Sequence, residues 1–259
     1  MKLTLIGNGA MAKALAIGLV VDYDVEVLGR DENKLKSFQD DIKIQTSKEV
    51  SIKVIENEEN IEGKNLILCV KPFSLIEVSK PLKGEANSVY SVLAGTTIES
   101  LKENITAKNY VRTMPNLSAA FLKSMTTITG NNALKETAIK IFSNIGQTLW
   151  VNTQKELDIA TGIAGSGPAF LALVAEAIAD GGVKCGLKRD DASTLVKGLF
   201  EGFAPLLNEN KPAIIKDNVM SPGGTTAAGY CAMEENGVRN GMIKGIEAAY
   251  EKAVELGKK

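Results

Sequence analysis

The sequence contains no histidine among its 259 residues. This absence excludes Ser-His-Asp and Cys-His nucleophilic catalysis, zinc and haem sites ligated by His, and acid–base chemistry carried by an imidazole. Excess positive charge is also absent, because 30 Lys and Arg stand against 31 Asp and Glu. The chain therefore lacks the charge typical of proteins that bind nucleic acids or anionic membranes. Its chemistry must depend on Lys, Ser, Thr, Tyr, carboxylates, backbone dipoles or a cofactor.

Cysteine and long apolar runs are scarce as well. Cys69, Cys185 and Cys231 are odd in number and form no CxxC pair, which excludes a disulfide framework and a zinc ribbon, and we expect all three to be buried. The longest apolar stretch, 169–179, is interrupted by Glu176 and is shorter than the roughly 20 residues of a membrane span. The N-terminal apolar run is too short for a signal peptide. We expect a soluble, cytoplasmic protein.

The first part of the chain alternates short apolar runs with helical patterns, which is typical of βαβ units and a parallel sheet. Strands are expected over 2–6, 25–28, 65–70, 88–93, 110–112, 126–129 and 148–151. Helices are expected over 10–21, 31–39 and 132–144, with another beginning near Thr97.

From residue 154 onward the pattern is helical throughout. The segment 160–182 contains seven Ala and five Gly, small residues that allow helix backbones to approach closely. A helix with so few bulky side chains buries little apolar surface alone, so we expect it in a multi-helix core between subunits.

A glycine-rich loop joins the first strand to the first helix, and it reads Gly7-Asn8-Gly9-Ala10-Met11-Ala12. This is a G-x-G-x-x-A form of the dinucleotide-binding fingerprint. Gly7 permits a tight turn, Gly9 permits close approach of a pyrophosphate, and the helix N-terminus offers unpaired N–H groups. The alternative is a tight turn without a ligand. With the strand pattern, the loop predicts a doubly wound α/β Rossmann domain over 1–152, followed by an all-α domain over 153–259.

The end of the second strand bears on the choice of dinucleotide. Enzymes that prefer NAD usually have an acidic residue there, whereas this chain has Arg30, with Lys34 four residues later. A guanidinium is suited to a 2′-phosphate, so the sequence favours NADPH, with NADH possible. The alternative is a surface ion pair between Arg30 and Asp31 or Glu32.

Two glycine-rich segments interrupt the helical part, at 162–168 and 221–226. In the first, Ser166 or Gly167 is suited to cap a helix that begins near Pro168. In the second, a Gly-Gly pair exposes backbone N–H groups at a helix start, which suits a substrate carboxylate. The alternative is that both are simply capped loops between helices.

These motifs together resemble the pyrroline-5-carboxylate reductase family over essentially the whole chain. The resemblance rests on Gly7-x-Gly9-x-Met11-Ala12, Val70-Lys71-Pro72, Ala94-Gly95, Arg112-x-Met114-Pro115-Asn116, Gly165-Ser166-Gly167-Pro168-Ala169, Asp217-Asn218-Val219 and Ser221-Pro222-Gly223-Gly224-Thr225-Thr226. The chain departs from the family at Leu117-Ser118 and Ile163-Ala164, where Thr-Pro and Leu-Ser are usual, and mildly at Cys69 and Met220.

The resemblance implies NAD(P)H-dependent reduction of 1-pyrroline-5-carboxylate to L-proline, the last step of proline biosynthesis. It also implies a Rossmann domain, an all-α dimerisation domain and decamers built from five dimers. Thr226 corresponds to a threonine that hydrogen-bonds the imine nitrogen, and Glu209 matches more weakly a Glu near the substrate amine. The substrate carboxylate is assigned to Ser221, Gly223, Gly224 and Thr225. The cofactor's ribose and nicotinamide are assigned to Val70, Lys71, Pro72, Met114, Pro115 and Asn116.

This chemistry is compatible with a chain that has no histidine. A cyclic imine nitrogen is basic and arrives protonated, so the protein need only bind and orient the reactants. One alternative, a β-hydroxyacid dehydrogenase, requires a catalytic Lys that is absent between Lys155 and Lys184. Another is a non-catalytic NADPH sensor, for which a carboxylate-binding loop would have no use.

Overall fold

The computed structural model describes residues 1–257, which form two compact units. The first unit comprises Met1–Ser166 together with the chain from Ala248 onward, and the second unit comprises Gly167–Glu247. The domains predicted from the sequence, 1–152 and 153–259, were divided where the sequence pattern changes, whereas the two units are defined by their compactness. That boundary stays a prediction.

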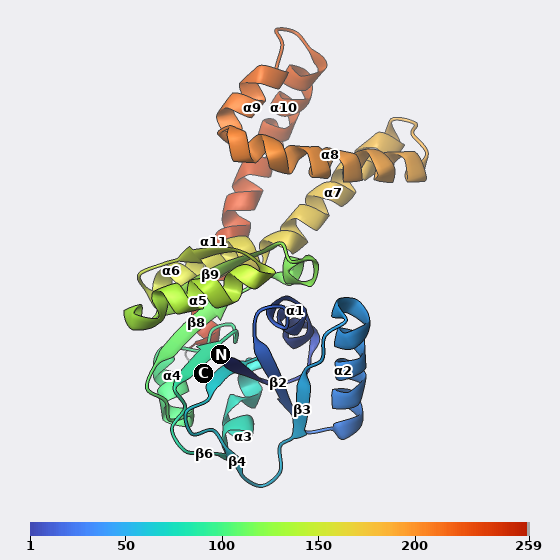
Figure 1. Ribbon diagram of the computed structural model, residues 1–259. Helices are drawn as coiled ribbons and strands as arrows, with labels where there is room; N and C mark the ends of the chain where they lie inside the picture. The colour runs from blue at the N-terminus through green and yellow to red at the C-terminus, as the bar shows by residue number, and fades with distance from the viewer. Residues whose placement is uncertain (258–259) are drawn as a thin grey trace. The chain divides into compact units, whose positions relative to one another are not determined.

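The first unit is built on an eight-stranded sheet (Figure 1). Its strands are β1 (Lys2–Ile6), β2 (Asp24–Gly29), β3 (Ser51–Val54), β5 (Asn65–Leu68), β7 (Ser88–Ser91), β8 (Tyr110–Met114), β9 (Ser124–Gly130) and β10 (Gly146–Trp150). The spatial order is β10-β9-β8-β7-β5-β1-β2-β3, and every neighbouring pair is parallel except β8 and β9. The order reverses beside β1, as in Rossmann folds, which confirms the predicted fold class.

Helices cover both faces of this sheet. Alternate residues of a strand face opposite sides, so Leu3 and Leu5 pack with one core cluster while Ile6 packs with the other. The first cluster is covered by α1 (Ala10–Leu19), α2 (Glu32–Thr46) and α5 (Lys135–Phe142), and the second by α3 (Leu75–Ser79) and α4 (Ile98–Asn104). Two short strands, β4 (Glu59–Asn60) and β6 (Leu82–Lys83), pair with each other in a separate sheet. Short 3₁₀ turns cover Pro72–Ser74, Leu117–Phe121, Asn132–Leu134 and Ser143–Ile145.

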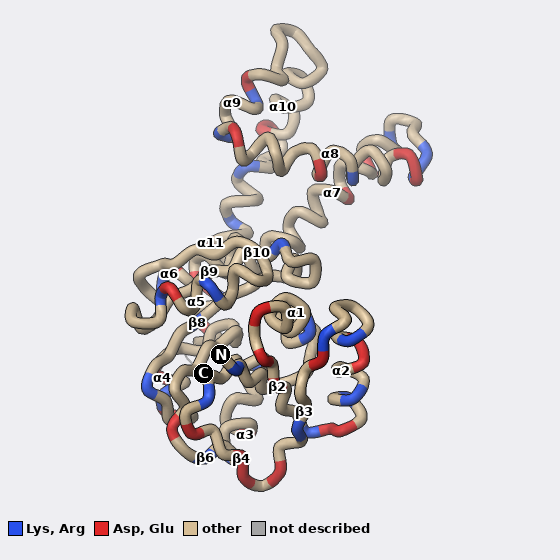
Figure 2. The backbone as a smooth tube through the Cα atoms, in the orientation of Figure 1, with Lys and Arg blue, Asp and Glu red and all other residues tan. Residues whose placement is uncertain are grey.

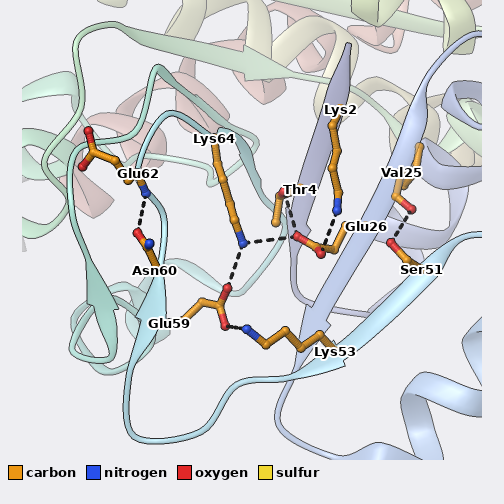
Figure 3. A network of polar contacts seen from close by, with 10 residues as sticks. All are labelled: Lys2, Thr4, Val25, Glu26, Ser51, Lys53, Glu59, Asn60, Glu62 and Lys64. Atoms are coloured by element: carbon orange, nitrogen blue, oxygen red, sulfur yellow. Dashed lines mark hydrogen bonds and ion pairs between the residues drawn. The ribbon is translucent and has the colours of Figure 1, made fainter.

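A polar network lies among strands β1, β2, β3 and β4 of the first unit (Figure 3). The buried carboxylate of Glu59 pairs with Lys53 at 2.5 Å and with Lys64 at 2.8 Å. Lys64 also pairs with Glu26, which in turn pairs with Lys2 and accepts a hydrogen bond from Thr4. Burial alone raises the pKa of Glu59, but the two lysines outweigh burial and lower it below its ordinary value of 4.5. The network therefore keeps a buried carboxylate ionised.

The second unit is made of helices. They are α7 (Gly167–Lys184), α8 (Arg189–Glu209), α9 (Pro212–Val219), α10 (Thr225–Glu235) and most of α11 (Val238–Leu256), whose last turns belong to the first unit. Its buried apolar residues, among those described, are Ala179, Ala192 and Val196. Leu173 and Leu195 are 65% and 61% exposed, and α7 carries few charges (Figure 2). This unit leaves most of its apolar surface uncovered within one chain.

Two expectations about the helical part were wrong. The segment before Pro168 is not a capped loop, because α6 (Gln154–Ala160) continues through a π-helical turn, Thr161–Gly165, toward α7. A π turn absorbs one extra residue without ending the helix, which periodicity does not reveal. Cys185 and Cys231 are exposed, whereas Cys69 is buried as expected. The two exposed thiols lie in the unit that leaves its own apolar surface uncovered.

Candidate active site

A cavity of 560 Å³ opens in the first unit beside β1, where the strand order reverses. Such switch points are where open α/β sheets bind ligands. The structure brings together in its lining most of the residues predicted to hold a cofactor, namely Gly7, Asn8, Gly9, Ala10, Met11, Arg30, Val70, Lys71, Pro72, Met114 and Pro115. Lys34 and Asn116 are not part of this lining. Leu93, Ala94 and Leu117 line it without having been predicted as site residues.

The two glycines of the loop have different physical roles. Gly7 has a φ of +111°, and a Cβ there would lie 2.8 Å from the carbonyl oxygen of Cys69. Gly9 is the N-cap of α1 and has no side-chain cap, and a Cβ there would meet nothing within 4 Å. Gly7 is therefore required by the fold, whereas Gly9 leaves open space in front of an uncapped helix N-terminus. That space fits a phosphate group.

Arg30 forms an exposed ion pair, but with a different partner from the two considered above. The Arg30 guanidinium lines the cavity and pairs with Glu77 of α3 at 2.6 Å, not with Asp31 or Glu32. Asp31 instead caps α2, where its carboxylate accepts the backbone N–H of Lys34 at 3.1 Å. Asp31 thus has a local structural role, and its presence beside Arg30 does not count against a 2′-phosphate.

Cys69 lines the cavity, and its backbone carbonyl lies close to Gly7. Burial raises the pKa of its thiol well above the ordinary value. The thiol is therefore protonated at neutral pH and is a poor nucleophile, so this cysteine serves as a small packing residue.

Two residues of the Arg112-x-Met114-Pro115-Asn116 motif make contacts with the α6 region. Arg112 is 2% exposed and pairs with Asp158 at 2.8 Å, with a second bond to the side-chain oxygen of Gln154 at 3.2 Å. Asn116 donates to the carbonyl of Ala164 at 3.1 Å. Sequence reasoning did not anticipate these contacts, because they pair residues that are more than 40 positions apart.

The glycine-rich loop of the second unit also ends at a helix N-terminus. Gly223 has a φ of +68°, and the N–H of Gly224 donates to the carbonyl of Ser221 at 3.1 Å, closing a turn. Gly224 is the N-cap of α10 without a side-chain cap, so the N–H groups of Thr225 and Thr226 have no partner within the helix. Thr226 is half-buried, while Ser221, Thr225 and Glu209 are exposed. This geometry suits a carboxylate.

Helix α10 is braced by groups that the sequence did not single out. The Lys216 ammonium lies 5.8 Å from the ring centre of Tyr230, whose hydroxyl accepts a bond from Arg239 at 2.7 Å. Arg239 also pairs with Glu234. These contacts join α9, α10 and α11 within the second unit. No cluster of potential metal ligands occurs among residues 1–257.

Known proteins match both parts of this chain. A family model described as pyrroline-5-carboxylate reductase dimerisation matches residues 154–256, and one described as NADP oxidoreductase, coenzyme F420-dependent, matches residues 2–95. A pyrroline-5-carboxylate reductase from Synechocystis sp. is 36% identical, with 100% of this chain and 99% of that protein covered. The chain belongs to the pyrroline-5-carboxylate reductase family.

Solved structures of this family agree. The reductase from Streptococcus pyogenes is 28% identical with a TM-score of 0.83, covering 98% of each chain. The pyrroline carboxylate reductase from Plasmodium falciparum, solved with NADP bound, is 27% identical with a TM-score of 0.78 and covers 99% of this chain and 100% of its own. The family likeness therefore extends through both units.

The family match also bears on the apolar helix of the second half. The continuous helix Gln154–Lys184 is long and apolar enough to cross a membrane by length and composition alone, a test that core helices of soluble proteins also pass. The same residues begin the region matched by the dimerisation model. Association between subunits therefore explains the apolar surface of this helix without a membrane.

Proposed function

We propose that this protein reduces 1-pyrroline-5-carboxylate to L-proline with NADPH, the last step of proline biosynthesis. The observation that carries the proposal is the cavity beside β1, where open space in front of Gly9 meets the uncapped N-terminus of α1. The full-length relationship to pyrroline-5-carboxylate reductases supports the substrate and the reaction.

The residues around the cavity fit an NADPH molecule. The loop Gly7–Met11 would hold the pyrophosphate and Arg30 the 2′-phosphate, with Lys34 adding positive charge nearby. Val70, Lys71 and Pro72 would border the ribose and nicotinamide, with Met114, Pro115 and Asn116 near the nicotinamide. When bound, NADPH supplies the hydride that reduces the imine carbon. NADH uses the same contacts except those to the 2′-phosphate.

The second unit supplies the groups proposed for the substrate. The loop formed by Ser221, Gly223, Gly224 and Thr225 would surround the carboxylate at the N-terminus of α10. The Thr226 hydroxyl would hydrogen-bond the imine nitrogen, and Glu209 would lie near it. Because that nitrogen is basic, it brings its own proton, and the absence of histidine costs the reaction nothing.

The assembly and location follow from the same features. We propose a homodimer formed through the exposed apolar helices of the second unit, with five dimers assembled into a decamer, in the cytoplasm. We also propose a functional division near residue 152, with the cofactor held by 1–152 and the substrate and partner by 153–259. The family model for dimerisation, which begins at residue 154, supports this division.

The decisive experiment is an assay of NADPH oxidation by purified protein with racemic pyrroline-5-carboxylate. NADH serves as the second cofactor and a hydroxy acid as the control substrate. We expect turnover of the imine with NADPH in preference to NADH, and none of the hydroxy acid with NADP⁺. An absence of imine turnover with both cofactors would refute the proposal.

A further inference from the structure

The π turn Thr161–Gly165 interrupts the helix that begins at Gln154. It is closed by the N–H of Ser166, which donates to the carbonyl of Thr161 at 2.9 Å. Single π turns insert one extra residue into a helix and occur frequently at functional sites. Pro168 comes three residues after the turn, and because proline has no N–H it cannot donate to the carbonyl of Ala164, four residues earlier.

Asn116 supplies the missing donor from another part of the chain. Its side-chain Nδ2 donates to the Ala164 carbonyl at 3.1 Å, while its Oδ1 accepts the N–H of Ser118 at 3.2 Å. The backbone N–H of Asn116 donates to the buried hydroxyl of Ser124 on β9 at 3.1 Å. Asn116 is thus fixed by the sheet on one side and holds the π turn on the other.

The π turn lies close to the wall of the cofactor cavity. A Cβ at Gly165 would lie 3.4 Å from the terminal methyl of Met114, which is ordinary van der Waals contact. Met114 and Pro115 line the cavity, and Asn116 is the next residue along the chain. A shift of the π turn would therefore move the Met114 side chain.

We infer that Asn116 is a positioning residue for the reduction, acting by locking the π turn against Met114. This inference rests on the proposed function and assigns Asn116 a role other than direct contact with the cofactor. Hydride transfer requires the reacting atoms in a narrow range of distances, and a displacement of about 1 Å costs on the order of 100-fold in rate. Loss of the Asn116 donor therefore lowers kcat.

The test is Asn116→Asp, which retains an oxygen to accept the Ser118 N–H but cannot donate to Ala164. The matched control is Asn131→Asp, an exposed residue whose Oδ1 accepts the N–H of Ala133 at 3.0 Å and whose Nδ2 donates to Asn109. We expect kcat to fall about 10- to 100-fold in N116D, with the Kd for NADPH near the wild-type value. N131D keeps the wild-type kcat.

A second variant separates positioning from stability. Pro168→Ala restores an N–H that can bond the Ala164 carbonyl, so N116D/P168A recovers the Tm lost in N116D. The hydrogen bond between Asn116 and the π turn stays absent in this double variant, so kcat stays low. A wild-type kcat in N116D overturns the inference, and so does recovery of kcat together with Tm in the double variant. The wild-type enzyme is assayed first, because inactivity there refutes the proposed function and this role with it.

Discussion

The two units of this chain differ most in how they treat apolar side chains. The first unit buries two clusters on the faces of its sheet, with Leu3, Leu5 and Leu66 fully covered. The second unit buries three small or medium side chains and exposes many leucines of α7 and α8. A unit that contributes so little core of its own gains its stability from association. The cavity proposed for the cofactor is lined by the first unit alone, whereas the helical unit belongs to the region matched by the dimerisation model.

The largest effect is expected from charging the exposed apolar face of the second unit. Leu173→Asp places a carboxylate on α7, where the native side chain is 65% exposed in the single chain. If a partner covers this face, the dimer dissociation constant rises about 100-fold or more. Ile44→Asp on α2 is the matched control, since Ile44 is 81% exposed in the first unit. Sedimentation or light scattering gives the mass of the oligomer. An intact L173D oligomer would contradict the conclusion that the second unit depends on association.

Thr226→Ala tests whether the substrate groups reside in the second unit. Removing a hydroxyl that hydrogen-bonds the imine nitrogen lowers kcat/KM about 10- to 100-fold. The Kd for NADPH should not change, because the cofactor cavity lies in the first unit. Steady-state kinetics and cofactor titration by fluorescence measure the two quantities. An unchanged kcat and KM would remove Thr226 from the mechanism.

Gly7→Ala and Gly9→Ala separate folding from binding within the first unit. Gly7→Ala forces an unfavourable φ and a clash with Cys69, which costs about 2 kcal/mol in the free energy of unfolding. Gly9→Ala meets no atom, so the unfolding midpoint stays unchanged while the Kd for NADPH rises about tenfold. Urea unfolding and cofactor titration check both results. Equal losses of stability in the two variants would show that Gly9 is structural.

Glu59→Gln tests the polar network of the first unit. It leaves Lys53 without a carboxylate and Lys64 with Glu26 alone, and it costs about 2 kcal/mol, less than a fully buried pair because both lysines reach water. The lowered pKa of Glu59 means that its contribution is present above pH 4.5 and is lost as the pH falls through the lower folded-state pKa. Between pH 7 and pH 3.5, urea unfolding should show a smaller decrease in the free energy of unfolding for E59Q than for wild type. Identical losses would exclude this role.

The smallest effect concerns cofactor choice. Glu77→Gln frees the Arg30 guanidinium from its exposed ion pair, so the Kd for NADPH should fall about threefold while that for NADH stays constant. Glu32→Gln is the control, because Glu32 pairs with Lys36 at 2.7 Å on the neighbouring helix and does not line the cavity. A parallel change in both dissociation constants would show that Arg30 does not recognise the 2′-phosphate.

Much of the fold was predictable because the first unit follows local rules. The strand 2–6 was predicted with its observed bounds, and the helix start near Thr97 matches a cap in which Thr97 accepts the N–H of Ser100. Strand β3 was not predicted, because Ser51–Val54 is only four residues long and contains two apolar residues, which is too short a pattern to stand out. The helix expected over 31–39 extends to Thr46, since Leu35, Phe38 and Ile42 continue one buried stripe.

The site was predictable where it depends on backbone conformation and less so where it depends on contacts between residues far apart in the sequence. The glycine loop could be recognised from the sequence, because its backbone conformation requires glycine. Nothing in the sequence indicated that Arg30 would meet Glu77, or that Asn116 would bond Ala164. Such contacts are set by the packing of elements far apart in the chain. The roles of the site residues stay predictions in both units.

The return of α11 to the first unit has a consequence for the order of synthesis. Gly95, beside the cavity-lining Ala94, has a φ of +74°, and a Cβ there would lie 2.8 Å from the Cβ of Leu256 and 3.3 Å from the carbonyl of Ala253. These partners leave the ribosome only after the whole of 167–247 has been made. The nascent first unit therefore completes its packing late, although its glycine loop is translated well before these partners.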